Sequence, residues 1–156
     1  MQQKQKNALP DFMLDADPTV RWPVTVELPA DGGQKAEFRF FANIRVLPDS
    51  GYDALEPAKS ETPPGISEVL QHNARILPQL VTGWSGIRDA SGPVPIERLP
   101  QIIQESPYGR ALSKGLWRAV AEVRFGLDAY DGGAALGNSE TSPADGLVTP
   151  AGEATN

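Results

Sequence analysis

The chain has 156 residues, 40% of them hydrophobic, and a formal net charge of −6, so it has enough apolar material for one core of ordinary domain size. It contains no Cys and one His, which excludes a disulfide framework, a thiolate metal site and a metal site built from several His. No apolar run approaches the roughly 20 residues that span a bilayer, and the basic N-terminus lacks the apolar segment of a secretory signal. We therefore expect a cytosolic protein with no membrane partner.

The negative charge is concentrated near the C-terminal end. Five acids and no bases between residues 128 and 156 give −5, which leaves −1 for residues 1–127. Neither part has the basic face that nucleic-acid binding requires, so we predict no nucleic-acid partner. Apolar residues are sparse at both ends, which predicts a flexible N-terminal arm over 1–18, a single domain over 19–126 and a disordered acidic tail over 127–156.

Alternation of apolar and polar residues predicts a β-hairpin over residues 20–47. Asp31-Gly32-Gly33 separates the two runs and can supply a turn with positive φ. Pro23 has no N–H, which places its strand at an edge or at the start of that strand. A lone hairpin is marginal in water, so its apolar face must be covered by the following helices or by a second copy of the chain. The residues of that face are Trp22, Val24, Val26, Leu28, Phe38, Phe40, Ala42, Ile44 and Val46.

A linker rich in Pro and Gly is predicted over 48–65, with a short helix starting near Tyr52 as an option within it. Apolar residues then recur at helical spacing from Ile66 to Trp84 and predict an amphipathic helix. Pro78 lies inside this segment, so we expect a kink or a split near Ala74.

Turn residues and short apolar runs follow the helix that we expect to contain Pro78. Between Trp84 and Pro95, a turn flanked by Ile87 and Val94 predicts a small hairpin. A short helix is expected from Ile96 to Ile103, and Ser106-Pro107 predicts the start of a last helix that ends near Gly126. The chain is therefore predicted to have an α+β fold, with an N-terminal hairpin and a helical part of about three helices over 66–126.

The sequence shows no constellation of residues for catalysis. His72 falls on the polar face of its helix, which favours an exposed surface residue over a general base. Ser85 superficially resembles a nucleophile elbow, but the second Gly stands one position too early. We predict no catalytic residues, no cofactor and no metal site. An enzyme remains the less favoured alternative, since it would need a pocket of convergent polar groups.

Two blocks of sequence, taken in this order, resemble one protein family. The first is the hairpin segment from Arg21 to Gly33 with its Phe-rich return strand over 37–47. The second, more specific block runs from Leu80 to Ile96 and is followed by a short helix and a closing helix over 106–125. This order is similar to that of the tail assembly chaperones of long-tailed bacteriophages. Pro78 and the proline-rich segment over 48–65 depart from that pattern.

The resemblance implies a helper protein in the cytoplasm of the infected bacterial host that is absent from the mature virion. Such a protein binds the tape measure protein, keeps its apolar helical segments soluble and helps recruit subunits of the major tail tube protein. The resemblance also implies a longer frameshifted form of the chain as a partner, and a homo-oligomer is a further option. The alternative is a structural subunit of the phage tail or neck that stays in the virion.

Four residues are candidate partner contacts. Phe41 stands on the polar face of the hairpin, and Trp117 stands beside the buried stripe of the last helix. For each of these two, a core or subunit-contact role is an equal alternative. Trp84 and Ile87 in the second block complete the set, although we expect Trp84 to anchor its turn in the core.

Overall fold

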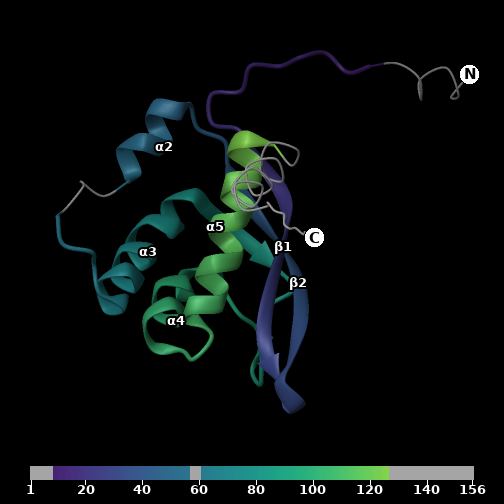
Figure 1. Cartoon of the computed structure of the whole chain (residues 1–156). Coiled ribbons are helices and arrows are strands. Elements are labelled where there is room, and N and C mark those ends of the chain that lie inside the picture. The colour runs from purple at the N-terminus through teal and green to yellow at the C-terminus, as the bar shows by residue number, and fades with distance from the viewer. Residues whose placement is uncertain (1–8, 57–60, 127–156) are drawn as a thin grey trace, which may run out of the picture.

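The computed structural model describes residues 9–56 and 61–126, so the predicted acidic tail and the start of the predicted arm lie outside the described residues. An antiparallel sheet lies on one side, and the helices pack against one of its faces (Figure 1). The predicted α+β fold is confirmed.

The strands are β1 (Thr19–Ala30), β2 (Gln34–Arg45) and β3 (Val81–Ser85) in one sheet, and β4 (Arg88–Asp89) and β5 (Gly92–Pro93) in a second. The α-helices are α2 (Asp49–Leu55), α3 (Ile66–Leu80), α4 (Leu99–Glu105) and α5 (Gly109–Phe125).

The hairpin forms as its alternation predicts. Val24 pairs with Phe40 and Trp22 with Ala42, so the apolar side chains of both strands share one face. The turn uses the left-handed backbone of Gly32 (φ 75°) and Gly33 (φ 77°), which Gly adopts without strain. Because the strand order is β1-β2-β3, β1 is an edge strand of this sheet, as its proline predicts.

The helix that was predicted to reach Trp84 ends at Leu80, so this prediction is wrong over its last turn. Val81–Ser85 instead forms β3, which pairs antiparallel with the end of β2. Val81 and Thr82 are β-branched and Gly83 is a poor helix former, so this segment gains more from the sheet than from another helical turn. A short apolar run is compatible with the period of a helix and with that of a strand. The free edge of β2 can pair with a further strand, and this favours the strand.

α3 continues through Pro78, so the split that was one of the two expectations near Ala74 does not occur. Pro78 lies in the last turn of the helix, so the missing N–H removes only the hydrogen bond to the carbonyl of Ala74. The helix then ends two residues later, at Leu80. A proline this close to the C-terminal end costs much less than one in the middle, because few helical hydrogen bonds follow it.

The segment predicted as a linker contains α2, which starts at Asp49. Tyr52 anchors this helix, since its ring is 4% exposed and its hydroxyl donates a hydrogen bond to the carbonyl of Arg45 (3.1 Å). The same hydroxyl accepts a hydrogen bond from the backbone N–H of Leu47 (3.2 Å). One side chain thereby ties α2 to the end of β2.

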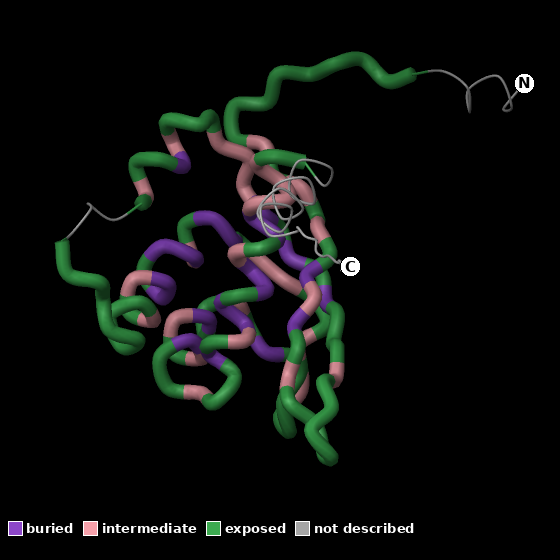
Figure 2. The backbone as a smooth tube through the Cα atoms, in the orientation of Figure 1, coloured by how far each residue is buried: buried purple, intermediate pink, exposed green. Residues whose placement is uncertain are grey.

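The chain's own helices cover most of the apolar face of the hairpin, although Phe38 on that face stays 54% exposed, and α5 packs against β1 (Figure 2). Its closest approach is at Gly115, where an added Cβ would lie 2.6 Å from the carbonyl oxygen of Thr25 and 3.1 Å from Cγ2 of Val26. The helix starts at Gly109, two residues later than predicted, and in the turn before it Ser106 Oγ accepts the backbone N–H of Tyr108 (3.0 Å), the kind of capping contact that was expected of Ser106. Gly109 then passes close to the carbonyl of Ile103, where a side chain would clash. The helix ends at Gly126 (φ 89°), which agrees with the predicted C-terminal cap.

We predict that Gly115→Ala lowers the free energy of unfolding by about 1–3 kcal/mol, because the new methyl group overlaps a backbone carbonyl that cannot move without shifting β1. Helix propensity alone predicts the opposite sign, a gain of about 1 kcal/mol. Urea unfolding of the two proteins measures the difference. Lys114→Ala, at the exposed neighbouring position, is the control and should change stability by less than about 0.5 kcal/mol. A stabilised Gly115→Ala protein would contradict the close approach.

Candidate functional site

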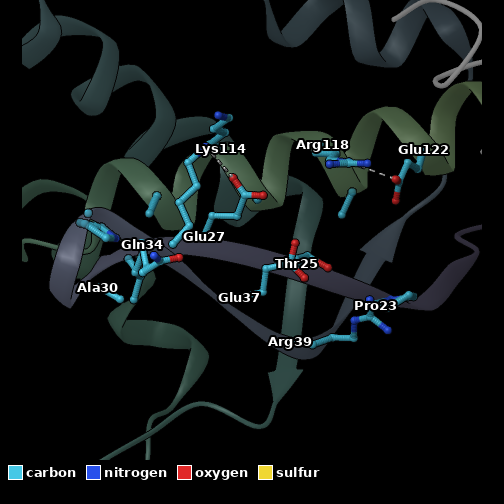
Figure 3. Close-up of a pocket in the computed structure, with 17 residues that line it drawn as sticks. Pro23, Thr25, Glu27, Ala30, Gln34, Glu37, Arg39, Lys114, Arg118 and Glu122 are labelled. Atoms are coloured by element: carbon cyan, nitrogen blue, oxygen red, sulfur yellow. Dashed lines mark hydrogen bonds and ion pairs between the residues drawn. The ribbon is translucent and has the colours of Figure 1, made fainter. Parts of the chain in front are cut away.

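The larger of the two concave surfaces described here is a cleft of about 720 Å³ between the hairpin and α5, which we call the hairpin–helix cleft (Figure 3). One wall is formed by the outer edge of β1 and by residues of β2, and the other wall by one side of α5. The hairpin contributes residues of its polar face, among them Thr25, Glu37 and Arg39. Its charged lining residues are Glu27, Lys35, Glu37, Arg39, Lys114, Arg118 and Glu122.

The charges of the hairpin–helix cleft are only partly paired. Lys35 lies 3.9 Å from Glu27, and Arg118 lies 3.4 Å from Glu122. The second carboxylate oxygen of Glu122 accepts a hydrogen bond from the indole N–H of Trp22 (2.9 Å), which ties α5 to β1. Four of the cleft's seven charged side chains are therefore engaged with one another. The other three are exposed and form no ion pair within the described residues: Glu37, Arg39 and Lys114.

A second concave surface of about 320 Å³ lies between α2, α3 and α5, and we call it the α2–α5 groove. Most of its lining is apolar or aromatic, and Phe125 at its end is 56% exposed. A groove with an apolar floor and an exposed aromatic residue is suited to the apolar side chains of another protein. The apolar and aromatic residues are Tyr52, Leu55, Leu80, Trp117, Val120, Ala121 and Phe125.

Three carboxylates gather around Arg124, which lines the α2–α5 groove together with one of them, Glu56. Arg124 pairs with Asp53 (3.0 Å), Asp49 (3.2 Å) and Glu56 (3.9 Å), so three carboxylates surround one guanidinium. These hydrogen bonds, with the one to Asp53 foremost, raise the pKa of Arg124. The three carboxylates are 68–82% exposed, whereas Arg124 is 15% exposed. A molecule that approaches the groove at Arg124 therefore meets more carboxylates than cations.

His72 also lines the α2–α5 groove. Burial is the main cause that lowers its pKa from 6.5, and the nearby charge of Arg75 lowers it further, while Glu56 opposes the shift. The Nη2 of Arg75 lies 3.0 Å from Nδ1 of His72, a distance that suits a neutral ring with Nδ1 as the acceptor. The ring of His72 thus forms part of the groove wall beside Arg75.

Trp117 lies in the floor of the α2–α5 groove, half-buried. Its indole N–H donates a hydrogen bond to Oδ1 of Asn73 (2.9 Å), so its polar atom is satisfied and its ring faces apolar neighbours. Asn73 is 8% exposed, and this bond explains how a polar side chain sits on the buried side of α3. Trp117 is the one predicted contact residue that lines a concave surface described here.

Trp84 and Ile87 belong to a compact turn that follows β3. The indole N–H of Trp84 donates a hydrogen bond to the carbonyl of Val94 (2.7 Å), and its ring meets that of Phe40 edge-on at 6.1 Å. The backbone N–H of Val94 donates to the carbonyl of Ile87 (3.0 Å), which closes the small β4–β5 hairpin that was predicted here. Trp84 and Ile87 are both half-buried, and the structure gives each a place in the turn itself.

Asp89 fixes the tip of the turn that follows β3. Its carboxylate accepts hydrogen bonds from the backbone N–H of Ser91 (2.8 Å) and from Nη1 of Arg98 (2.8 Å). These contacts, the Ser91 bond first, lower the pKa of Asp89. Gly86 (φ 100°) and Gly92 (φ 123°) supply the left-handed positions on either side. The second sequence block is therefore held by contacts within the turn and by Arg98, which follows the block.

Phe41 lies on the open face of the sheet, 36% exposed, with the guanidinium of Arg21 3.9 Å from its ring centroid. The four predicted contact residues do not meet in one place. Trp84 and Ile87 share a turn, Trp117 lies in the α2–α5 groove, and Phe41 lies on the opposite face of the hairpin. Sequence reasoning missed the acidic cluster around Arg124, because these contacts join segments about 70 residues apart. It also missed Tyr52 as an anchor, although the contacts of Tyr52 are local, to Arg45 and Leu47.

Among residues 9–56 and 61–126, no group of three or more His, Asp or Glu side chains could hold a metal ion. None of the helices in those ranges has the length and apolar character needed to cross a membrane. Comparisons with protein-family models, with curated proteins and with solved structures find no match to this chain.

We predict that Trp84→Phe lowers the free energy of unfolding by about 1–3 kcal/mol, because it leaves the carbonyl of Val94 without its donor in a buried position. Thermal or urea unfolding measures the effect. Tyr108→Phe, which removes a hydroxyl from a 56% exposed side chain, is the control and should be nearly neutral. Equal stability of the Trp84→Phe and parent proteins would show that this hydrogen bond is not made.

His72 gives a pH-dependent prediction. Because its pKa in the folded chain is below 6.5, the unfolded chain binds the proton first, and stability falls as the pH drops through about 6.5. His72→Gln should therefore lose less stability between pH 7.5 and pH 5 than the parent protein does, as measured by urea unfolding. His72 is the only His in the chain, so NMR titration gives its pKa directly. A measured value above 6.5 would reverse the sign and contradict the burial of the ring.

Proposed function

We propose that this protein is a tail assembly chaperone of a long-tailed bacteriophage, one that binds the tape measure protein in the host cytoplasm and helps recruit major tail tube subunits. The observation that carries the proposal is the resemblance of the two sequence blocks to that family, together with their place in one compact unit. β3 joins the second block to the hairpin as the third strand of its sheet. A longer frameshifted form of the chain belongs to the same proposal as an additional partner.

The α2–α5 groove is the surface that best suits the proposed client. Its volume of about 320 Å³ fits the anchor side chains of an amphipathic helix that lies across it. The carboxylates around Arg124 favour a helix that carries Lys or Arg beside its apolar stripe, since opposite charges at the rim speed association and select the partner. Covering the apolar stripe of such a helix keeps it from aggregating.

A permanent subunit of the tail or neck is the second candidate function. The unpaired edge of β1 favours it, because strand edges can pair between subunits when rings are built. Mass spectrometry of purified particles separates the two candidates. The chaperone proposal expects the protein to be absent from finished virions and abundant in infected cells.

Coexpression with the tape measure protein of the same phage tests the chaperone proposal. We expect the chain to raise the soluble fraction of the tape measure protein several-fold and Phe125→Asp to abolish most of that gain, because a charge at the end of the groove repels an apolar helix face. Ile66→Asp is the matched control, since Ile66 is 58% exposed, close to the 56% of Phe125, and does not line the groove. No gain in solubility with the parent chain would refute the chaperone proposal. Equal effects of the two variants would refute the assignment to this groove.

A further inference from the structure

The N-terminal arm, residues 9–18, is an extended segment that leaves the body of the protein (Figure 1). Its four large apolar side chains contact almost nothing, since Leu9, Phe12, Met13 and Leu14 are 72–91% exposed. A cluster of apolar side chains with this exposure is characteristic of a segment that binds another surface. The arm therefore requires a cover that a single copy of the chain does not provide in this structure.

The direction of the arm is set at its base. The backbone N–H of Val46 donates a hydrogen bond to the carbonyl of Pro18 (2.9 Å), and Arg45 pairs with Asp17 (3.2 Å). These contacts fix the base of the arm beside the end of β2, and the backbone bends at residues 16 and 17. The arm leaves from the end of β1 that does not line the cleft, and it points away from the cleft (Figure 1). Entry into that cleft would require the arm to reverse direction just before these contacts. A second copy of the chain can receive the arm without any reversal.

The hairpin–helix cleft matches the arm in length and shape. The part of β1 that lines it, Pro23 to Ala30, spans about 26 Å at the usual rise of a strand, and the apolar part of the arm, Leu9 to Leu14, spans about 20 Å. The cleft runs beside the unpaired edge of β1, where an extended segment fits better than a helix. Its apolar lining residues are Pro23, Leu28, Pro29, Ala30, Ala111 and Ala119.

Charge selects the hairpin–helix cleft over the α2–α5 groove. Residues 7–20 contain three acids, Asp11, Asp15 and Asp17, and no Lys or Arg. In the cleft, the charged side chains without an ion pair are Arg39, Lys114 and one Glu, so an incoming acidic segment meets net positive charge. The α2–α5 groove has exposed carboxylates at one end, which repel the same segment.

We propose that the arm of one copy of this protein binds the hairpin–helix cleft of a second copy, and that the exchange is reciprocal. In a reciprocal exchange each copy inserts its arm into the cleft of the other, so the same contact forms twice and the assembly is a closed dimer. Pro23 and Pro29 remove two backbone donors from the edge of β1, so no continuous strand ladder forms. Recognition rests on the apolar residues of the arm and on its acids, with Asp11 and Asp15 placed near Arg39 and Lys114. The inference is independent of the function proposed above.

Light scattering after size-exclusion chromatography of the full chain tests the proposal. We expect a mass of twice 16.7 kDa. D11K/D15K and R39E/K114E should each weaken dimerisation by about tenfold or more, because each variant places like charges in contact. E97K/E105K makes the same change in net charge as D11K/D15K at exposed positions of another surface, and it should remain dimeric.

Mixing the two weakened variants makes the test specific. When D11K/D15K meets R39E/K114E, the basic arm faces the acidic cleft and the acidic arm faces the basic cleft, so both contacts are complementary and the dimer should return. Circular dichroism checks that each variant is folded. A parent chain that stays at 16.7 kDa up to high concentration would overturn the proposal, as would a mixture that stays monomeric. A monomeric chain whose arm is protected from proteolysis would mean that the arm binds its own body, which also overturns the exchange.

Discussion

The close contact between α5 and β1 at Gly115 is the constraint on which the rest of the structure depends. A two-stranded hairpin cannot bury its apolar face alone, and here a helix from the far end of the described chain covers it. That helix reaches the strand only because position 115 has no side chain between its backbone and the carbonyl of Thr25. The indole of Trp22 and the carboxylate of Glu122 add a hydrogen bond farther along the same helix. Together these contacts set the angle at which α5 crosses the hairpin.

Part of this fold follows directly from sequence patterns. Alternation between Trp22 and Val46 has only one good interpretation, because a shift of one residue would expose every apolar side chain of the hairpin. Local rules also locate the turn after Trp84 and the end of the last helix at Gly126, since glycines with positive φ act within a few residues. Such features need no knowledge of the rest of the chain.

Other parts depend on contacts between distant segments. The run from Val81 to Trp84 fits a helix and a strand equally well, and the open edge of β2, which is some 40 residues away in sequence, decides for the strand. The acids of α2 are ordinary surface residues by sequence, and only the fold places Arg124 among them. Of the predicted contact residues, only Trp117 lines a groove. Its ring is oriented by a hydrogen bond to Asn73 on another helix, a contact that the sequence alone does not reveal.

The two proposed interactions use different faces of one helix, α5. On α5, Lys114, Arg118 and Glu122 recur every four residues and face the hairpin–helix cleft, whereas Trp117, Ala121 and Arg124 recur every three or four residues and face the α2–α5 groove. The cleft offers unpaired cations, and the groove has exposed carboxylates at one end, so an acidic segment and a basic one are drawn to two neighbouring faces of the same helix. Under the two proposals, a copy of the chain can therefore hold the arm of its partner and a client helix at once. Because both walls belong to one rigid element packed on the hairpin, binding on one side has no need to displace what is bound on the other.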